Sequence, residues 1–244
     1  MQSPNPASPP GSASEPLSPP LSPRSVGWLA QLRQHRAIAV IRTDQLETGV
    51  QIAAAVADGG LPLIEVTWNS DRPAHLLHRL REQLPHCTIG AGTLLSQDQV
   101  QEAIAAGAEF LFTPHTQPAL IRGAYEADVP MVAGTLTPTE IVTAWQAGAT
   151  AAKVFPIGAV GGAAYLRSLQ GPLGHIPLIP TGGVTLDNAP QFLEAGAIAI
   201  GLSGQLFPQG AIALSDWAQI TRLTQTLCQR LAPYCIPATP PPQS

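Results

Sequence analysis

Cysteine and charge are both scarce in this sequence. Three of the 244 residues are cysteines, and Cys87, Cys228 and Cys235 are widely spaced. That pattern predicts neither a disulfide framework nor a zinc site, and it favours a reducing compartment. Charged residues make up 11% of the chain, with a formal net charge of −4 and no block of lysine or arginine. We therefore expect no nucleic-acid-binding surface.

Long apolar runs are missing as well. No stretch free of glycine, proline and charge is long enough to span a bilayer, and the first residues lack the basic and apolar segments of a secretory signal. The six histidines show no metal-ligand spacing. We therefore expect a soluble, cytoplasmic protein that needs no metal or other cofactor and does not bind a membrane.

Both ends of the chain are rich in proline and poor in large apolar residues. Residues 1–25 contain mainly proline, serine and alanine, and residues 235–244 are again proline-rich. Such segments bury too little apolar surface to offset the entropy lost on ordering, so we expect a disordered and a flexible tail. Residues 26–234 remain, which is long enough for one barrel domain.

Between the tails, short apolar runs alternate with longer segments of helical periodicity. The runs expected to form strands are 37–41, 63–67, 88–93, 110–114, 130–134, 151–155, 177–180 and 197–201. This alternation indicates βαβ units and a parallel sheet. Eight units favour a closed (β/α)8 TIM barrel, although counting alone does not exclude an open doubly wound sheet. Residues 24–35 are expected to form an extra N-terminal helix that covers the barrel floor.

Two ionisable residues lie inside apolar runs that are expected to be strands. Lys153 lies in the run 151–155 and Glu65 in the run 63–67. Burial disfavours the charged ammonium, so Lys153 is a candidate for a neutral amine that attacks a carbonyl. Burial is also expected to raise the pKa of Glu65 and to suit it to proton transfer near neutrality. The alternatives are an outward-facing Lys153 that reaches solvent and a Glu65 that only pairs with a cation.

Glycine-rich turns follow the last two expected strands. The turn 180–183 contains Thr181, Gly182 and Gly183 and is predicted to open a helix, while Ser203 follows the eighth strand. Backbone N–H groups in such turns bind anions, and TIM barrels often hold phosphate after strands seven and eight. Both turns are therefore candidates for a phosphate site, although glycine is also the common turn residue.

A set of motifs is spread along the expected barrel, from about Trp28 to Leu231. The motifs are Ile64-Glu65-Val66-Thr67, Gly90-Ala91-Gly92-Thr93, Thr113-Pro114, Gly134-Thr135-Leu136-Thr137-Pro138-Thr139-Glu140, Lys153-Val154-Phe155-Pro156 with Gly161-Gly162, and Pro180-Thr181-Gly182-Gly183. In this order and spacing they resemble the 2-dehydro-3-deoxy-phosphogluconate (KDPG) / 4-hydroxy-2-oxoglutarate (KHG) aldolase family. The resemblance implies class I (Schiff-base) chemistry without a metal, on a TIM barrel, in a homotrimer.

The resemblance also implies roles for individual residues. Lys153 aligns with the Schiff-base lysine and Glu65 with the general acid and base. Thr93 and Pro114 would surround the pyruvate portion of a 2-keto acid substrate, and Phe155 would pack on that substrate. The residues implied to hold its distal phosphate or polar end are Thr181, Gly182, Gly183 and Ser203.

One position departs from the family pattern. After Glu-Val-Thr the family continues with Leu-Arg, and that arginine helps to bind an anionic group, whereas this chain has Trp68-Asn69. An amide does not replace an arginine–carboxylate contact. Arg42 is a candidate for supplying the charge instead. Thr67 and Asn69 are still expected to contact the substrate.

The expected reaction is cleavage of KDPG to pyruvate and glyceraldehyde 3-phosphate, cleavage of KHG to pyruvate and glyoxylate, or both. Oxaloacetate decarboxylation and cleavage of 2-dehydro-3-deoxy-6-phosphogalactonate are alternatives at the same site. Two alternatives of another class stay open at this point, namely a phosphate-binding isomerase or epimerase and a non-catalytic phosphate-binding barrel. The isomerase would keep its activity in Lys153→Ala.

Overall fold

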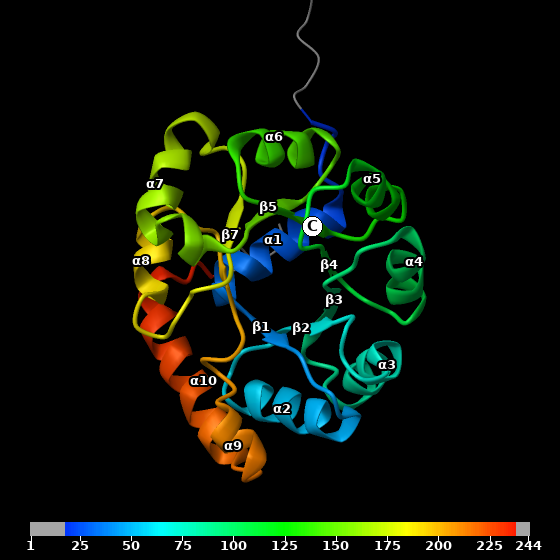
Figure 1. Cartoon of the computed structure of the whole chain (residues 1–244), viewed down its shortest axis with the longest axis vertical. Helices are drawn as coiled ribbons and strands as arrows, with labels where there is room; N and C mark the ends of the chain where they lie inside the picture. The colour runs from blue at the N-terminus through cyan, green and yellow to red at the C-terminus, as the bar shows by residue number, and fades with distance from the viewer. Residues whose placement is uncertain (1–17, 238–244) are drawn as a thin grey trace, which may run out of the picture.

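Within residues 18–237, which the structure describes, eight parallel strands form a ring with helices around its outside (Figure 1). The structure is a computed structural model. The strands are β1 (Ala37–Ile41), β2 (Leu63–Thr67), β3 (Thr88–Gly92), β4 (Leu111–Phe112), β5 (Met131–Thr135), β6 (Ala151–Val154), β7 (Leu178–Pro180) and β8 (Ile200–Leu202). The helices are α1 (Pro23–His35), α2 (Leu46–Asp58), α3 (Pro73–Gln83), α4 (Gln97–Ala105), α5 (Pro118–Glu126), α6 (Pro138–Gln146), α7 (Gly162–Leu173), α8 (Ala189–Glu194), α9 (Gln209–Ala213) and α10 (Trp217–Leu231).

The ring of strands closes on itself. Its strands follow the order β7-β6-β5-β4-β3-β2-β1-β8. A bridge between Thr181 and Gly201 joins β7 to β8, and the Ile198 N–H donates to the Leu178 carbonyl at 3.0 Å beside it. This closure confirms the predicted (β/α)8 barrel and rules out the open doubly wound sheet.

Side chains along each strand point alternately into the barrel and toward the helices, as the pleat requires. On β6, Ala152 and Val154 pack in the apolar layer under the helices, whereas Ala151 packs inside the barrel. Lys153 shares the inward face with Ala151. On β2, Glu65 likewise shares the inward face with Leu63. The register of two strands therefore directs both ionisable side chains into the barrel.

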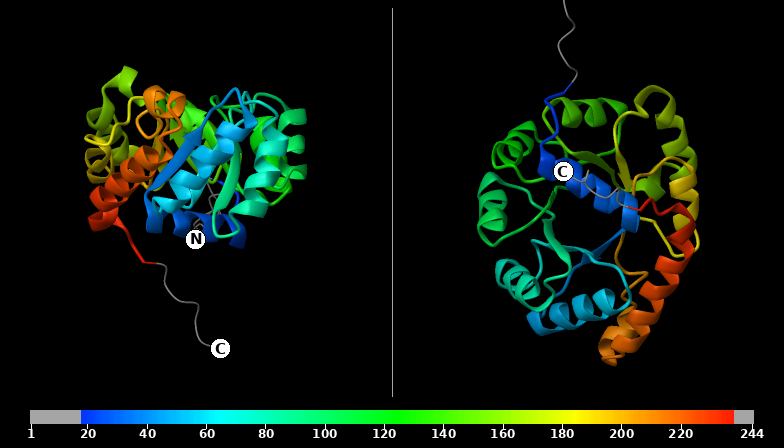
Figure 2. Two further views of the ribbon diagram at one scale, coloured as in Figure 1. Left: turned by 90° about the horizontal axis from the view of Figure 1, so that it is seen from below. Right: turned by 180° about the vertical axis from the view of Figure 1, so that it is seen from behind.

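The extra N-terminal helix closes one end of the barrel. α1 begins with Pro23, and the Ser22 side chain caps it by accepting from the Ser25 N–H at 3.1 Å. The helix runs across the end of the ring, with both described ends of the chain on that side (Figure 2). Trp28 and Leu32 are buried against the residues that fill the barrel interior. The predicted floor helix is thus confirmed.

The expected tails and some strand limits differ from the structure. The disordered segment predicted for 1–25 is too long, because residues 23–25 already belong to α1; residues 1–17 lie outside the described part. At the other end, the Ile236 N–H donates to the Arg33 carbonyl at 3.0 Å, so the flexible tail predicted from 235 begins too early, while residues 238–244 again lie outside the described part.

Two strands were also predicted imperfectly. β4 is shorter than the predicted 110–114, and β8 lies further along the chain than the predicted 197–201. An apolar run shows which residues are buried, but the pairing with both neighbouring strands decides where a strand begins and ends.

Among the described residues, no helix combines the length and the apolar character needed to cross a membrane.

Candidate active site

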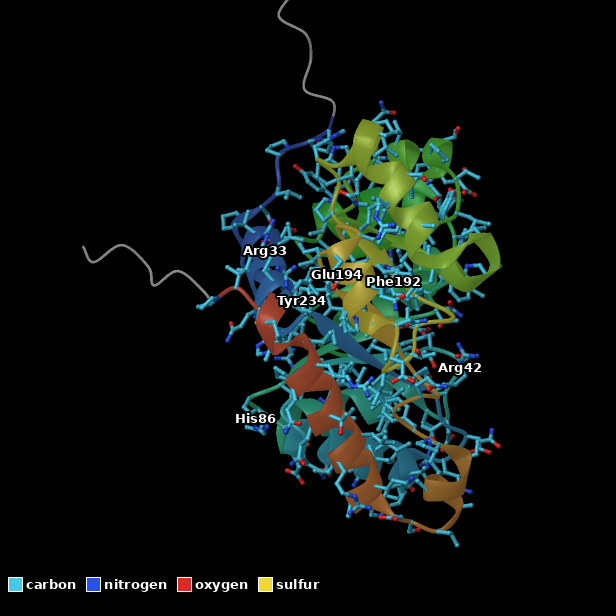
Figure 3. The ribbon with its side chains drawn as sticks, turned by 90° about the vertical axis from the view of Figure 1, so that its left-hand side faces the viewer. Arg33, Arg42, His86, Phe192, Glu194 and Tyr234 are labelled. Carbon is cyan, nitrogen blue, oxygen red and sulfur yellow. The ribbon has the colours of Figure 1, made fainter. Side chains whose placement is uncertain are left out.

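A cavity of about 580 Å³ opens at the carboxyl ends of the strands. It lies at the end of the barrel opposite the floor helix: Figure 3 shows Arg42, which lines the cavity, on the far side from Arg33 and Tyr234. The lining residues are Val40, Arg42, Glu65, Thr93, Pro114, Lys153, Phe155, Thr181, Gly182, Gly183, Val184, Thr185, Gly201, Ser203, Gly204 and Gln205. Active sites of this barrel type occupy this face.

Lys153 is the only lysine in the 244 residues, and it is buried inside the barrel with 5% of its surface exposed. Lysine is among the residues least often buried, so a chain whose sole lysine is buried is unusual. Its Nζ lies 5.0 Å from the centroid of the Phe155 ring and 5.6 Å from that of Phe112. No described carboxylate forms an ion pair with Lys153. The amine is therefore surrounded by aromatic surface and faces the cavity.

Glu65 enters the same cavity from β2 and is 1% exposed. Burial raises the pKa of this carboxyl group, and the positive charges of Lys153 and Arg42 partly oppose that rise. Its Oε1 is buried without a hydrogen-bond partner among the described residues. A carboxyl group with a raised pKa and an unused oxygen, in the same cavity as an amine, is suited to moving protons there.

Glycines at inward-facing strand positions make room for this arrangement. A Cβ at Gly92 of β3 would overlap the carboxylate of Glu65, and a Cβ at Gly90 would overlap the ring of Phe110. On β5, a Cβ at Gly134 would overlap the backbone of Pro114. The motifs that carry the family resemblance thus include glycines whose missing side chains create space in the barrel.

Thr93 adds a strained backbone to the rim of the cavity. It has φ of 60°, a left-handed conformation that is costly for a β-branched residue. Thr93 and Pro114 both line the cavity, as does Phe155, which is 37% exposed. The two residues expected to surround a pyruvate group and the one expected to pack on the substrate therefore line one cavity with Lys153.

The two glycine turns line the opposite part of the cavity. Thr181 is 9% exposed and its buried hydroxyl has no partner among the described residues. Within residues 18–237 the N–H group of Gly183 likewise has no acceptor, whereas Gly182 follows the bridge between Thr181 and Gly201. α8 begins only at Ala189, so the prediction that this turn opens a helix is wrong. Any anion here would be held by turn amides rather than by a helix N-terminus.

A family model described as KDPG and KHG aldolase matches residues 29–223. The chain belongs to this family. The 2-dehydro-3-deoxy-phosphogluconate aldolase of Pseudomonas aeruginosa is 34% identical over 202 residues, which cover 83% of this chain and 92% of that protein. The KHG/KDPG aldolase of Escherichia coli is 29% identical over 77% of this chain and 88% of its own.

A solved structure extends the comparison to three dimensions. KDPG aldolase from Legionella pneumophila, with pyruvate captured at low pH as a covalent carbinolamine, superimposes with a TM-score of 0.76 at 27% identity, covering 82% of this chain and 97% of that one. The protein is thus an aldolase, a lyase that acts on a small molecule. Family membership confirms the resemblance inferred from the motifs.

Two residues expected to contact the substrate of this aldolase do not line the cavity. Thr67 is fully buried, and its hydroxyl pairs with that of Ser70 at 3.1 Å. Asn69 is exposed and lines a neighbouring hollow, of about 510 Å³, which Arg42 also borders. The position at which the resemblance implies an arginine therefore lines this hollow and not the cavity that holds Lys153. Among the described residues, Arg42 alone borders both spaces.

Several lining residues were not expected from the sequence. Val40 lies two residues before Arg42 on an inward-facing run, so strand alternation would have found it. Thr185 and Gln205 follow the glycine turns at positions that no periodicity marks. The aromatic neighbour Phe112 was overlooked because it resembles any core residue of a strand.

Among the described residues, no three histidine, cysteine or acidic side chains are grouped as a metal would require.

Proposed function

We propose that this chain is a class I aldolase that cleaves KDPG to pyruvate and glyceraldehyde 3-phosphate, or KHG to pyruvate and glyoxylate. The observation that carries the proposal is the meeting of the sole lysine, Lys153, with Glu65 in one cavity. The relatives named for these two substrates support the choice. The covalent pyruvate adduct of the Legionella relative supports the carbonyl chemistry.

In the proposed mechanism, Lys153 attacks the C2 carbonyl of the 2-keto acid to give a carbinolamine. Protonated Glu65 delivers a proton to the carbinolamine hydroxyl, which leaves as water and yields the iminium. The Glu65 carboxylate then takes the proton of the C4 hydroxyl, the C3–C4 bond breaks, and an aldehyde leaves. Glu65 returns that proton to C3 of the remaining enamine, and hydrolysis releases pyruvate and the free amine. One lysine thus supplies the whole electron sink.

Charge in the cavity supports an anionic substrate with two polar ends. Arg42 is the cation at the rim, and it has no ion-pair partner among the described residues. The free N–H group of Gly183 and the unpaired hydroxyl of Thr181 offer a second anion site, and Gly182 and Ser203 lie beside them. In the proposed complex, Arg42 contacts one charged end of the substrate. The glycine turns contact the other end, which is a phosphate in KDPG and a carboxylate in KHG.

The test is reduction of the enzyme with borohydride in the presence of pyruvate, read by intact and peptide mass spectrometry. We expect one pyruvate-derived mass gain on the peptide that carries Lys153 and a loss of aldol cleavage by at least about 10³-fold in Lys153→Ala. Because the chain has no other lysine, only the α-amino group of the first residue competes, and the peptide map separates the two sites.

A second variant controls for the presence of an amine. Lys153→Ala combined with Arg33→Lys restores one lysine at the exposed, opposite end of the barrel (Figure 3). It is expected to give neither adduct nor cleavage. The Schiff-base proposal is abandoned if wild-type protein gives no adduct at saturating pyruvate, or if Lys153→Ala retains activity, as an isomerase would.

The homotrimer implied by the resemblance stays a prediction, which sedimentation equilibrium tests.

A further inference from the structure

We propose that the face of the Phe112 ring stabilises the positive charge that develops on Lys153 Nζ when the iminium forms, and that Trp28 of the floor helix positions this ring. The proposal rests on the Schiff-base chemistry proposed above. It gives a function to an aromatic column inside the barrel. Phe112 would thereby contact a reacting atom, whereas Trp28 would act through it.

The distances place Nζ within reach of two rings. Its separations of 5.6 Å from the Phe112 centroid and 5.0 Å from the Phe155 centroid both fall inside the roughly 6 Å range of cation–π attraction. The two rings differ in exposure, since Phe112 is 1% exposed and Phe155 is 37% exposed. Water weakens the interaction, so the shielded ring of Phe112 is expected to contribute more.

Little else in the cavity can meet a positive charge on Nζ. Among the described residues, Glu65 is the only carboxylate that lines the cavity, and none forms an ion pair with Lys153. In the proposed mechanism Glu65 gives up its proton as the iminium forms and takes a proton as the C3–C4 bond breaks, so its charge changes during the cycle. A ring face carries no proton and is not consumed. It therefore offers the iminium a constant partner at every step.

The orientation of Phe112 is fixed from the floor of the barrel. Phe110 and Phe112 meet edge to face, with centroids 5.8 Å apart and an interplanar angle of 76°. Trp28 contacts both, at 5.2 Å from Phe110 and 6.3 Å from Phe112. Gly90 makes room for the Phe110 ring, which a Cβ at that position would overlap. Edge-to-face contacts of this kind hold a ring in one orientation.

The decisive experiment reduces the negative electrostatic potential of the Phe112 ring face while keeping the shape of the ring nearly unchanged. Phenylalanine at position 112 is replaced by analogues with increasing numbers of fluorine atoms, and the pyruvate concentration for half-maximal borohydride trapping is measured. We expect this concentration to rise with each added fluorine, by about five- to thirty-fold over the series. Phe192 of α8, buried in the outer apolar layer (Figure 3), receives the same analogues as the matched control and should show no trend.

Variants at Trp28 test the positioning step. Trp28→Leu should raise the half-maximal pyruvate concentration several-fold, and Trp28→Phe should restore most of the loss because it returns an aromatic edge to Phe112. A flat series at position 112, matching that at 192, overturns the proposal and leaves Phe112 as a packing residue. If unsubstituted protein forms no adduct at all, the Schiff-base function fails and the Phe112 proposal falls with it, so the two failures are distinguishable.

Discussion

Two ionisable side chains lie inside an otherwise apolar barrel, and each is shaped by its neighbours. Lys153 has aromatic rings around its amine, and Glu65 has a buried oxygen without a partner among the described residues. Such groups cost stability, because an uncompensated polar atom in a buried site has lost its water. Their presence together in one cavity is typical of a functional site rather than of a stabilising pair.

The raised pKa of Glu65 predicts a pH dependence of stability. Above the ordinary glutamate pKa of about 4.3, the folded protein holds the Glu65 proton more tightly than the unfolded chain does. The folded state then binds more protons, so the free energy of unfolding falls as the pH rises through this window toward the raised pKa. Glu65→Gln, which cannot ionise, should flatten that fall in urea titrations at a series of pH values.

Glu47 provides a control with the opposite sign. It is exposed, and its hydrogen bond with Arg79 lowers the pKa of its carboxyl group. Its stabilising effect is present above the ordinary pKa and is lost as the pH falls. Glu47→Gln should therefore leave the decline above about pH 4.3 in place. An unchanged pH profile in Glu65→Gln would contradict the assignment of that decline to Glu65.

At the scale of the element, β3 shapes the site by what it omits. Two of its three inward positions are Gly90 and Gly92, opposite Glu65 and Thr67 of β2 in the parallel register, and the third is Thr88 at the floor end. Side chains there would fill the space that Glu65 and Phe110 now occupy. Glycine weakens a strand, so its use at these two inward positions indicates a close approach by neighbouring groups. The missing side chains of this strand thus leave room for Glu65 and Phe110.

Gly92→Ala is expected to remove most of the aldol cleavage while the protein still folds. The φ of Gly92 is not among the positive ones, so alanine fits the backbone, but its Cβ would displace the Glu65 carboxylate. A shift of about 1 Å in a catalytic group can cost about 10²-fold in rate, and we expect a fall of that order in kcat. The measurement is steady-state cleavage of KDPG, together with the thermal unfolding midpoint.

Gly27→Ala is the matched control for this substitution. Gly27 is exposed in α1 and a Cβ there meets no atom within 4 Å. Alanine in the helix should raise stability by about 0.4–1 kcal/mol and leave cleavage unchanged. Near-normal cleavage by Gly92→Ala would show that the Glu65 carboxylate tolerates displacement. That result would count against Glu65 as the general acid and base.

At the scale of the whole molecule, the end of the floor helix and the C-terminal segment meet below the barrel. Arg36 follows α1 and donates from Nε to the Tyr234 carbonyl at 2.7 Å and from Nη1 to the Ile198 carbonyl at 2.8 Å. The Tyr234 hydroxyl in turn donates to Glu194 at 2.6 Å. Figure 3 shows Tyr234, Glu194 and Arg33 gathered on this side, away from Arg42. One arginine therefore connects the floor helix, the segment just before β8 and the C-terminal segment.

Arg36→Ala should destabilise the fold and spare the chemistry. Losing two charged hydrogen bonds that leave carbonyls unpaired is expected to lower the free energy of unfolding by about 2–3 kcal/mol. Cleavage measured well below the unfolding transition should be unchanged, since the site lies at the other end of the barrel. Urea unfolding and steady-state kinetics check the two halves of this prediction.

Arg33→Ala provides the comparison for Arg36→Ala. Arg33 is exposed and contributes its backbone carbonyl, not its guanidinium, to the described contacts of this region. Its replacement should change the free energy of unfolding by no more than about 0.5 kcal/mol. Equal losses in the two variants would indicate a general charge effect instead of the two hydrogen bonds of Arg36.

The local sequence determined the elements and the residues that stand out within them. Apolar periodicity predicted the barrel, the floor helix and the limits of β1 and β2, because each strand is buried on both faces and stays apolar along its length. Lys153 and Glu65 were recognisable from the sequence since each interrupts such a run. The family was recognisable from the spacing of its motifs.

Tertiary structure alone decided which side chains face one another. The closure of β7 on β8, the hollow that Asn69 lines together with Gln209 and the approach of Phe112 to Nζ all bring together residues far apart in the chain. No local pattern carries that information, because Phe112 and Asn69 look like any core or loop residue. The sequence thus specified the chemistry of Lys153 and Glu65, and the packing of the barrel determined the environment in which that chemistry takes place.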